Sequence, residues 1–132
     1  PTSEILVITT PQVAAAEVAE RAGRIAHQIH QRVIGVIENM SAISCPKCGE
    51  EMALFGEGGG EETSKRLTTL VGADVPLMGK VPFNVDLREG GDQGAPVVVS
   101  APESASAQAI SAIVDKLVIR QGSLLGVRLG LA

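Results

Sequence analysis

The chain has 132 residues, 45% of them hydrophobic and 20% charged, so it is long enough for one domain with a real core and is neither disordered nor collagen-like. Phe55 and Phe83 are its only aromatic residues and its net charge is −4, which argues against a base-stacking or phosphate-binding surface for nucleic acid. No apolar run reaches membrane-spanning length and no signal-peptide pattern is present, so we expect no membrane partner.

The first part of the chain predicts a βαβ unit. Residues 4–10 are a nearly continuous apolar run, typical of a strand buried on both faces of a parallel sheet. Residues 33–37 predict a second strand of the same kind. Between them, residues 12–32 predict a helix whose core-facing side chains recur at helical spacing. These side chains are Val18, Ala22, Ile25 and Ile29.

The rest of the chain alternates irregular and regular segments, starting with an irregular loop over residues 38–60, a length that is usually functional. The later expectations are a helix over 61–71 closed by Gly72, a strand over 75–81, a turn or short helix over 86–94, a brief strand over 97–100 and a helix over 103–120. The tail, residues 121–132, has no assigned structure. The alternation predicts an α/β fold with a mainly parallel sheet.

The most specific chemical motif is Cys45-Pro46-Lys47-Cys48-Gly49. In such a turn the backbone N–H groups point at the sulfur atoms, and glycine accepts the positive φ that the turn needs. The shape commonly supplies half of a tetrahedral thiolate site. Because the chain has no further cysteine, the simplest completion is a two-fold dimer in which each subunit donates one pair.

Three other interpretations of Cys45 and Cys48 stay open. A thioredoxin-like redox pair uses the same spacing, with its first cysteine at the start of a helix. His27 and His30 could complete a zinc site within one chain. The two thiols could also be unliganded structural residues.

Two further places are candidates for ligand binding. Asn39 follows the second predicted strand, and Val81-Pro82 stands at the end of the third, where α/β proteins bind ligands; an asparagine there is also a common turn residue. The glycines of residues 56–60 precede a helix, so they could bind phosphate, although a flexible hinge is favoured.

Five stretches, in this order, resemble the C-terminal half of the Mrp/ApbC family, the ATP-binding iron–sulfur carrier proteins with a deviant P-loop that are related to ParA-type ATPases. They are ILVITTPQVAAAEVAERAG (5–23), VIGVIENMS (33–41), CPKCG (45–49), FGEGGGEE (55–62) and VPLMGKVPFNVDLREGGDQGAPVV (75–98). The resemblance covers about residues 3–116.

The resemblance implies that residues 1–120 are the C-terminal part of a P-loop ATPase domain with a mainly parallel, helix-flanked sheet and a CxxC loop at 40–60. It implies that Cys45 and Cys48, with the same pair from a second subunit, hold a [4Fe–4S] cluster. It assigns adenine recognition to Asn39, and places Val81 and Pro82 on the loop beside the base. The family's P-loop lysine and Mg²⁺ ligands belong to its N-terminal part and are not found in these residues, so we expect no ATP hydrolysis by this chain alone.

The function implied by the resemblance is that of an ATP-dependent iron–sulfur cluster scaffold or carrier. It would be a cytoplasmic homodimer that passes its cluster to apo iron–sulfur proteins. The alternative is a zinc-bridged structural or chromosome-partitioning-type ATP-binding module without cluster transfer. The identity of the bound metal distinguishes the two.

Overall fold

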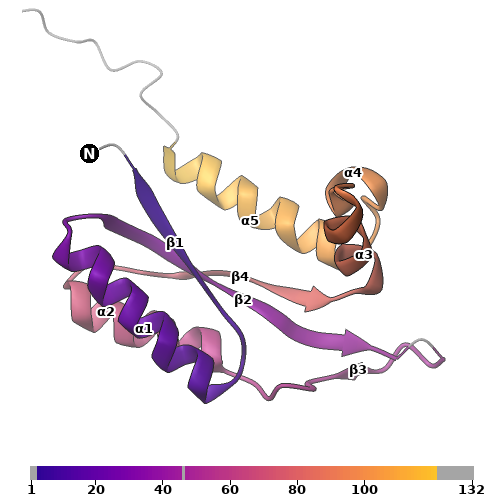
Figure 1. The fold of residues 1–132 in the computed structure, drawn as a ribbon, viewed down its shortest axis with the longest axis horizontal. Helices are drawn as coiled ribbons and strands as arrows, with labels where there is room; N and C mark the ends of the chain where they lie inside the picture. Colours follow the sequence, from indigo (N-terminus) through magenta and orange to yellow (C-terminus); the bar gives the residue numbers. More distant parts are fainter. Residues whose placement is uncertain (1–2, 46, 122–132) are drawn as a thin grey trace, which may run out of the picture.

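A computed structural model describes residues 3–45 and 47–121 and shows helices on both faces of a four-stranded sheet (Figure 1). The elements are β1 (Glu4–Thr9), α1 (Val13–Gln28), β2 (Arg32–Ser44), β3 (Glu51–Met52), α2 (Gly59–Val71), β4 (Leu77–Phe83), α3 (Val85–Gln93), α4 (Val97–Ser100) and α5 (Ala105–Gln121). The predicted α/β class is therefore confirmed. No helix within the described ranges is long and apolar enough to cross a bilayer.

The sheet is built around β2, the longest strand. β1 runs parallel to its first half, ending with Thr9 opposite Glu38. β4 runs parallel along the other side, and β3 pairs antiparallel with the end of β2, so that Ile43 lies between Phe83 and Met52. The predicted βαβ unit and mainly parallel sheet are confirmed, with one short antiparallel strand added.

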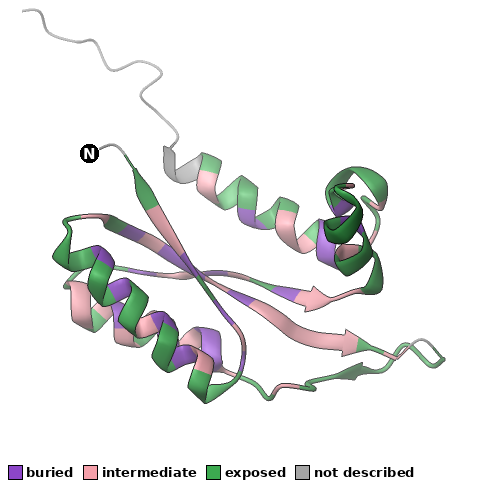
Figure 2. Ribbon diagram, viewed as in Figure 1, coloured by how far each residue is buried: buried purple, intermediate pink, exposed green. Residues whose placement is uncertain are grey.

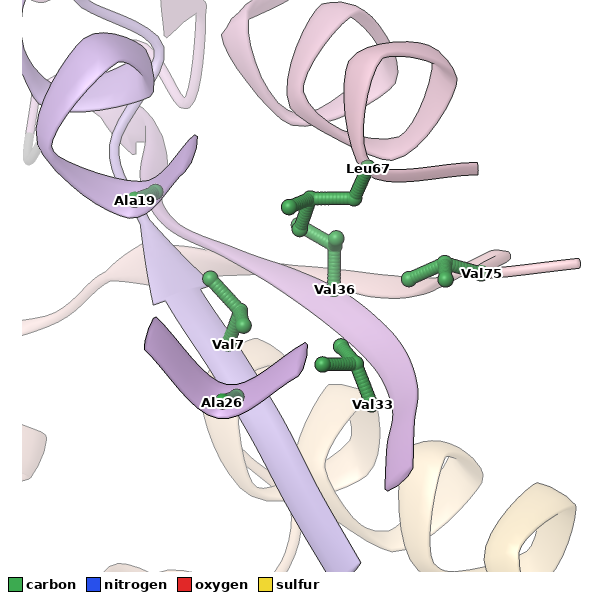
Figure 3. Packing of buried hydrophobic residues seen from close by; sticks show 7 residues of the cluster. All are labelled: Val7, Ala19, Ala26, Val33, Val36, Leu67 and Val75. Atoms are coloured by element: carbon green, nitrogen blue, oxygen red, sulfur yellow. The ribbon is translucent and has the colours of Figure 1, made fainter. Parts of the chain in front are cut away.

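Alternate residues of the central strands face two separate hydrophobic clusters. Val7 and Val36 face α1 and α2, in a cluster completed by Ala19, Ala26, Val33, Leu67 and Val75 (Figure 3). Leu6 and Ile37 face α5, against a cluster formed by Met78, Val81 and Ile113. Because β2 is covered on both faces, the run at 33–37 is apolar almost throughout.

The predicted core-facing side of α1 is wrong. The helix buries small residues, namely Ala16, Ala19, Gly23 and Ala26, while Val18 and Ile25 are 65% and 58% exposed (Figure 2). Ile29, just past the helix, is also 58% exposed, and Ala22 faces outward as well. The reason is close helix packing, since a Cβ at Gly23 would overlap the buried side chain of Leu67 on α2.

β1 is not buried on both faces as expected. Ile8 is 63% exposed, and Ile5 and Leu6 are half-buried. Within the described part of the chain, β1 pairs with β2 alone, so its other edge carries unpaired backbone groups.

The irregular loop expected over residues 38–60 is wrong in its first part, because β2 continues to Ser44 and forms a hairpin with β3. Within β2, Met40 has a left-handed backbone, with φ 57°, and the pairing with β4 shifts register between Asn39 and Ile43. A pattern search for regular strands does not anticipate such an irregularity.

The brief strand expected over 97–100 is wrong, because these residues form the single turn α4. The N–H groups of Val99 and Ser100 both donate to the Pro96 carbonyl oxygen, which closes a helical turn despite three consecutive valines. The helices expected over 61–71, 86–94 and 103–120 are confirmed as α2, α3 and α5. The remaining tail, 122–132, lies outside the described residues.

The glycine-rich segment before α2 is held by close packing. Gly58, the N-cap residue, has φ 84°. A Cβ on Gly59 would lie 2.5 Å from the Pro11 carbonyl oxygen, and one on Gly60 would lie 2.8 Å from Cβ of Glu38. The sequence favoured a flexible hinge at these glycines. In the structure, these contacts hold the start of α2 against Pro11 and against Glu38 of β2.

We predict that Gly59→Ala lowers the free energy of unfolding by about 1–3 kcal/mol, because the backbone that its Cβ would meet cannot turn aside. The measurement is urea unfolding followed by circular dichroism. Gly91→Ala in α3 is the matched control; nothing lies within 4 Å of its added Cβ, so it should stabilise by about 0.5–1 kcal/mol. Equal stability of the Gly59→Ala variant and the wild type would contradict the packing argument.

Candidate functional site

The β2–β3 hairpin carries Cys45 and Cys48 in its turn, at one end of the sheet (Figure 1). The Cys45 N–H donates to the Glu50 carbonyl oxygen at 2.9 Å, and the Gly49 N–H donates to the Cys45 carbonyl oxygen at 2.9 Å. Gly49 has φ 76°, the positive value that the sequence predicted. Cys45 is half-buried and Cys48 is exposed.

The turn favours the thiolate form of Cys45. The backbone N–H groups of Cys48 and Lys47 hold the pKa of the Cys45 thiol below its ordinary value, with a further contribution from the Cys48 side chain. The direction of this shift agrees with backbone N–H groups pointing at the Cys45 sulfur, as the sequence predicts. The thiolate is the form of cysteine that binds soft metals.

The structure separates the cysteines from the two histidines. His27 and His30 lie at the C-terminal end of α1, before β2 begins, whereas Cys45 follows the end of β2. The 13 residues of β2 separate them by roughly 40 Å at about 3.3 Å per residue. A zinc site completed by these histidines within one chain is therefore excluded, and so is the thioredoxin-like interpretation, because Cys45 opens a hairpin turn and not a helix.

Cys45 and Cys48 could supply two ligands of a metal site, but they do so without further ligands from the described residues. Across residues 3–45 and 47–121, no group of three or more His, Cys, Asp or Glu side chains is placed to hold a metal ion. Because four-coordinate thiolate centres need four ligands, two cysteines in one turn could provide only half of such a site.

Asn39 and Val81 are direct neighbours on parallel strands, but their side chains face different surroundings. Asn39 lines a groove of about 500 Å³ beside Thr9, Thr10 and α1, and its amide oxygen accepts from the Met40 N–H at 2.9 Å. The Val81 side chain is buried against Ile113 of α5, and Val81 does not line that groove. Pro82 lines another cavity, of about 470 Å³.

Three charged residues at the base of the hairpin were missed by the sequence analysis. Glu38 is 1% exposed, and its carboxylate accepts from the Gly60 N–H at 2.6 Å. Lys80 lies 3.7 Å from Glu38 and 2.7 Å from Glu61. The sequence did contain a signal for this network, because Glu38 directly follows the apolar run at 33–37. A carboxylate buried at the end of such a strand needs hydrogen-bonding or charged partners on neighbouring elements.

This network stabilises the charged forms of Glu61 and Lys80. The hydrogen bond from Lys80 holds the pKa of the Glu61 carboxyl below its ordinary value, and the same bond raises the pKa of Lys80. The second Glu61 carboxylate oxygen is buried without a hydrogen-bond partner in the described structure. Glu38, Lys80, Glu51 and Glu57 line the same 470 Å³ cavity as Pro82, so this face of the hairpin is acidic.

We predict that Lys80→Met lowers the free energy of unfolding by about 1–2 kcal/mol at pH 7, because it leaves the buried Glu38 without its cation. The loss is no larger because water screens the charge of the Lys80 side chain, which is 43% exposed. The contribution of Glu61 is present above its ordinary pKa of 4.5 and is lost as the pH falls through the lowered value in the folded protein. The stability gap should therefore shrink in acid. Urea unfolding between pH 3 and pH 8 measures it, with Arg21→Met, at an exposed cation on α1, as control. A gap independent of pH would contradict the assignment.

Comparison with known proteins places the chain among iron-transfer P-loop NTPases. A family model described as ParA, NUBPL iron-transfer P-loop NTPase, matches residues 1–118. The iron–sulfur cluster carrier protein of Mycobacterium tuberculosis (strain ATCC 25618 / H37Rv) is 52% identical over 99% of this chain, which spans 34% of that protein. The iron–sulfur cluster transfer protein NUBPL of Mus musculus is 32% identical over 91% of this chain, which spans 36% of it.

Solved structures show the same fold. The cell division ATPase MinD of Pyrococcus furiosus superposes with a TM-score of 0.64 at 19% identity, over 89% of this chain and 43% of that one. A nucleotide-binding protein of Archaeoglobus fulgidus in complex with ADP gives a TM-score of 0.51 at 34% identity, over 68% of this chain and 35% of that one. The chain thus spans about a third of the length of the curated relatives that it matches.

Proposed function

The chain belongs to the ParA family of NUBPL-type iron-transfer P-loop NTPases, and on this basis we propose that it is part of an ATP-dependent iron–sulfur cluster carrier. The observation that carries the proposal is the hairpin turn, in which backbone N–H groups stabilise the Cys45 thiolate beside an exposed Cys48. A relative that is 52% identical carries the name iron–sulfur cluster carrier protein.

In this proposal the cargo is a [4Fe–4S] cluster bound between two copies of the chain. Cys45 and Cys48 of each copy supply two thiolates, which makes the four that such a cluster requires. The position of the pair at the tip of a hairpin leaves the cluster accessible from outside, as transfer to an apo iron–sulfur protein requires. Thiolates of this kind persist in a reducing compartment such as the cytoplasm.

We also propose that residues 1–120 form the adenine side of a nucleotide site. Asn39 lies at the carboxyl-terminal side of the parallel strands, where ligands bind in open α/β sheets, and its amide N–H₂ group is available for a base edge. Val81 would contribute backbone groups and Pro82 would flank the base. The residues that bind Mg²⁺ and the phosphates of ATP are expected outside this chain.

The alternative function is that of a structural module in which zinc joins two chains. Four thiolates bind Zn²⁺ as well as they bind a cluster, and the hairpin geometry suits both. The partitioning and cell division ATPases share this fold, so fold resemblance does not favour either function.

Analysis of metal and acid-labile sulfide on anaerobically purified protein tests the carrier function. We expect about two irons and two sulfides per chain, the share of a [4Fe–4S] cluster bridging two copies. The Cys45→Ser variant should lose both the iron and the sulfide, because the remaining thiols cannot complete the coordination. The control Ser44→Ala changes the neighbouring exposed residue and should keep the iron and the sulfide. Zinc at about half an equivalent without sulfide would favour the structural module instead.

The affinity for ADP and ATP tests the proposed role of Asn39 in adenine recognition. In the full-length protein, Asn39→Ala should weaken ADP and ATP binding about tenfold or more, because hydrogen bonds to the base edge are lost. Titration calorimetry provides the measurement. Asn84→Ala, at the sequence's other asparagine, removes the N-cap of α3 and should leave affinity unchanged. Unchanged affinity in the Asn39 variant would remove the adenine role.

A further inference from the structure

We infer that the apolar face of the cysteine hairpin is the surface on which a second copy of this chain docks around the cluster. The inference rests on the proposed function and adds to it the side chains that form the contact. It concerns the face of the hairpin opposite the acidic cavity lined by Glu51 and Glu57.

The apolar face contains a pocket of about 140 Å³ with an entirely apolar lining. Its residues are Met40, Ala42 and Ile43 from β2, Leu54 and Phe55 after β3, and Phe83 at the end of β4. Both aromatic residues of the chain therefore meet at this one place, although they are 28 positions apart in the sequence. A pocket of this size and lining suits an aliphatic side chain.

The pocket adjoins the cysteines. Ile43, in its lining, lies two residues before Cys45, a separation of roughly 7 Å along a strand. Met52 is paired directly with Ile43 across the hairpin, so the two side chains share a face. Met52 is 46% exposed and Leu54 is 66% exposed. Large apolar side chains therefore stand in water next to the proposed metal ligands.

The geometry of the half-site selects a second copy as the occupant. A cluster held by two such hairpins lies on the two-fold axis, so the residues within a few ångströms of Cys45 and Cys48 must face the same residues of the partner. Leu54 and Met52 are then placed to enter the partner's pocket, while the partner's equivalents enter this one.

Charge decides which face of the hairpin turns toward the axis. If the acidic face met its own copy, Glu51 and Glu57 would be brought against the same carboxylates of the partner, and like charges repel. If the apolar face meets its copy, the contact buries Met52 and Leu54 and leaves the carboxylates in water.

The test uses full-length protein reconstituted with iron and sulfide under anaerobic conditions. Sedimentation velocity over a concentration series gives the dimer dissociation constant, and iron and sulfide are assayed on the same samples. Leu54→Asp should raise the dissociation constant about tenfold or more, because two buried leucines become charged. Met52→Glu tests the same face through a second exposed residue, and Leu54→Met should restore wild-type behaviour.

Val99→Asp is the matched control, since Val99 is 78% exposed on α4 and remote in sequence from the hairpin. It should dimerise like the wild type. If Leu54→Asp and Met52→Glu keep both the cluster and the wild-type dissociation constant, this inference is overturned and the proposed function stands. If the wild-type protein takes up no iron and sulfide, the proposed function fails and the inference fails with it.

Discussion

The buried carboxylate of Glu38 is the interaction on which the arrangement of this end of the molecule depends. It receives the Gly60 N–H at 2.6 Å and lies 3.7 Å from Lys80, so one side chain on β2 fixes the start of α2 and the adjacent position on β4. A carboxylate that is 1% exposed is stable only with such partners. The next residues along β2 are Asn39 and Met40, and the cysteine hairpin follows. Glu38 therefore anchors the strand immediately before both proposed sites.

The proposed nucleotide site and the proposed cluster site are close together along the chain. Asn39 lies in β2, and Cys45 directly follows the end of that strand, six positions later, with the left-handed Met40 between them. A non-glycine residue in that conformation stores strain, and such residues are frequent where a backbone changes between two states. A nucleotide that shifted Asn39 would act on the hairpin through the five residues between Asn39 and Cys45. The proposed dimer contact would then transmit the change to the second copy of the cysteine pair.

The packing of α1 has a different physical basis from that expected. Small residues let the helix lie close to α2, where a Cβ at Gly23 would overlap the Leu67 side chain. The larger residues Val18 and Ile25 then point outward, on the same side of the molecule as the groove along β1. Burying the small residues gives α1 and α2 close contact, which fills the space between the helices.

The sequence by itself determined the α/β class, the parallel βαβ unit, the boundaries of most helices and the conformation of the cysteine turn. Those features depend on local periodicity, on glycine at a positive φ and on backbone hydrogen bonds within a few residues. The tertiary structure alone decided which stripe of α1 is buried, because both stripes have helical spacing. It also decided that residues 97–100 form a helical turn, that His27 and His30 stand far from the cysteines, and that Glu38 meets Lys80. These outcomes depend on contacts between elements distant in the sequence, which local patterns do not encode.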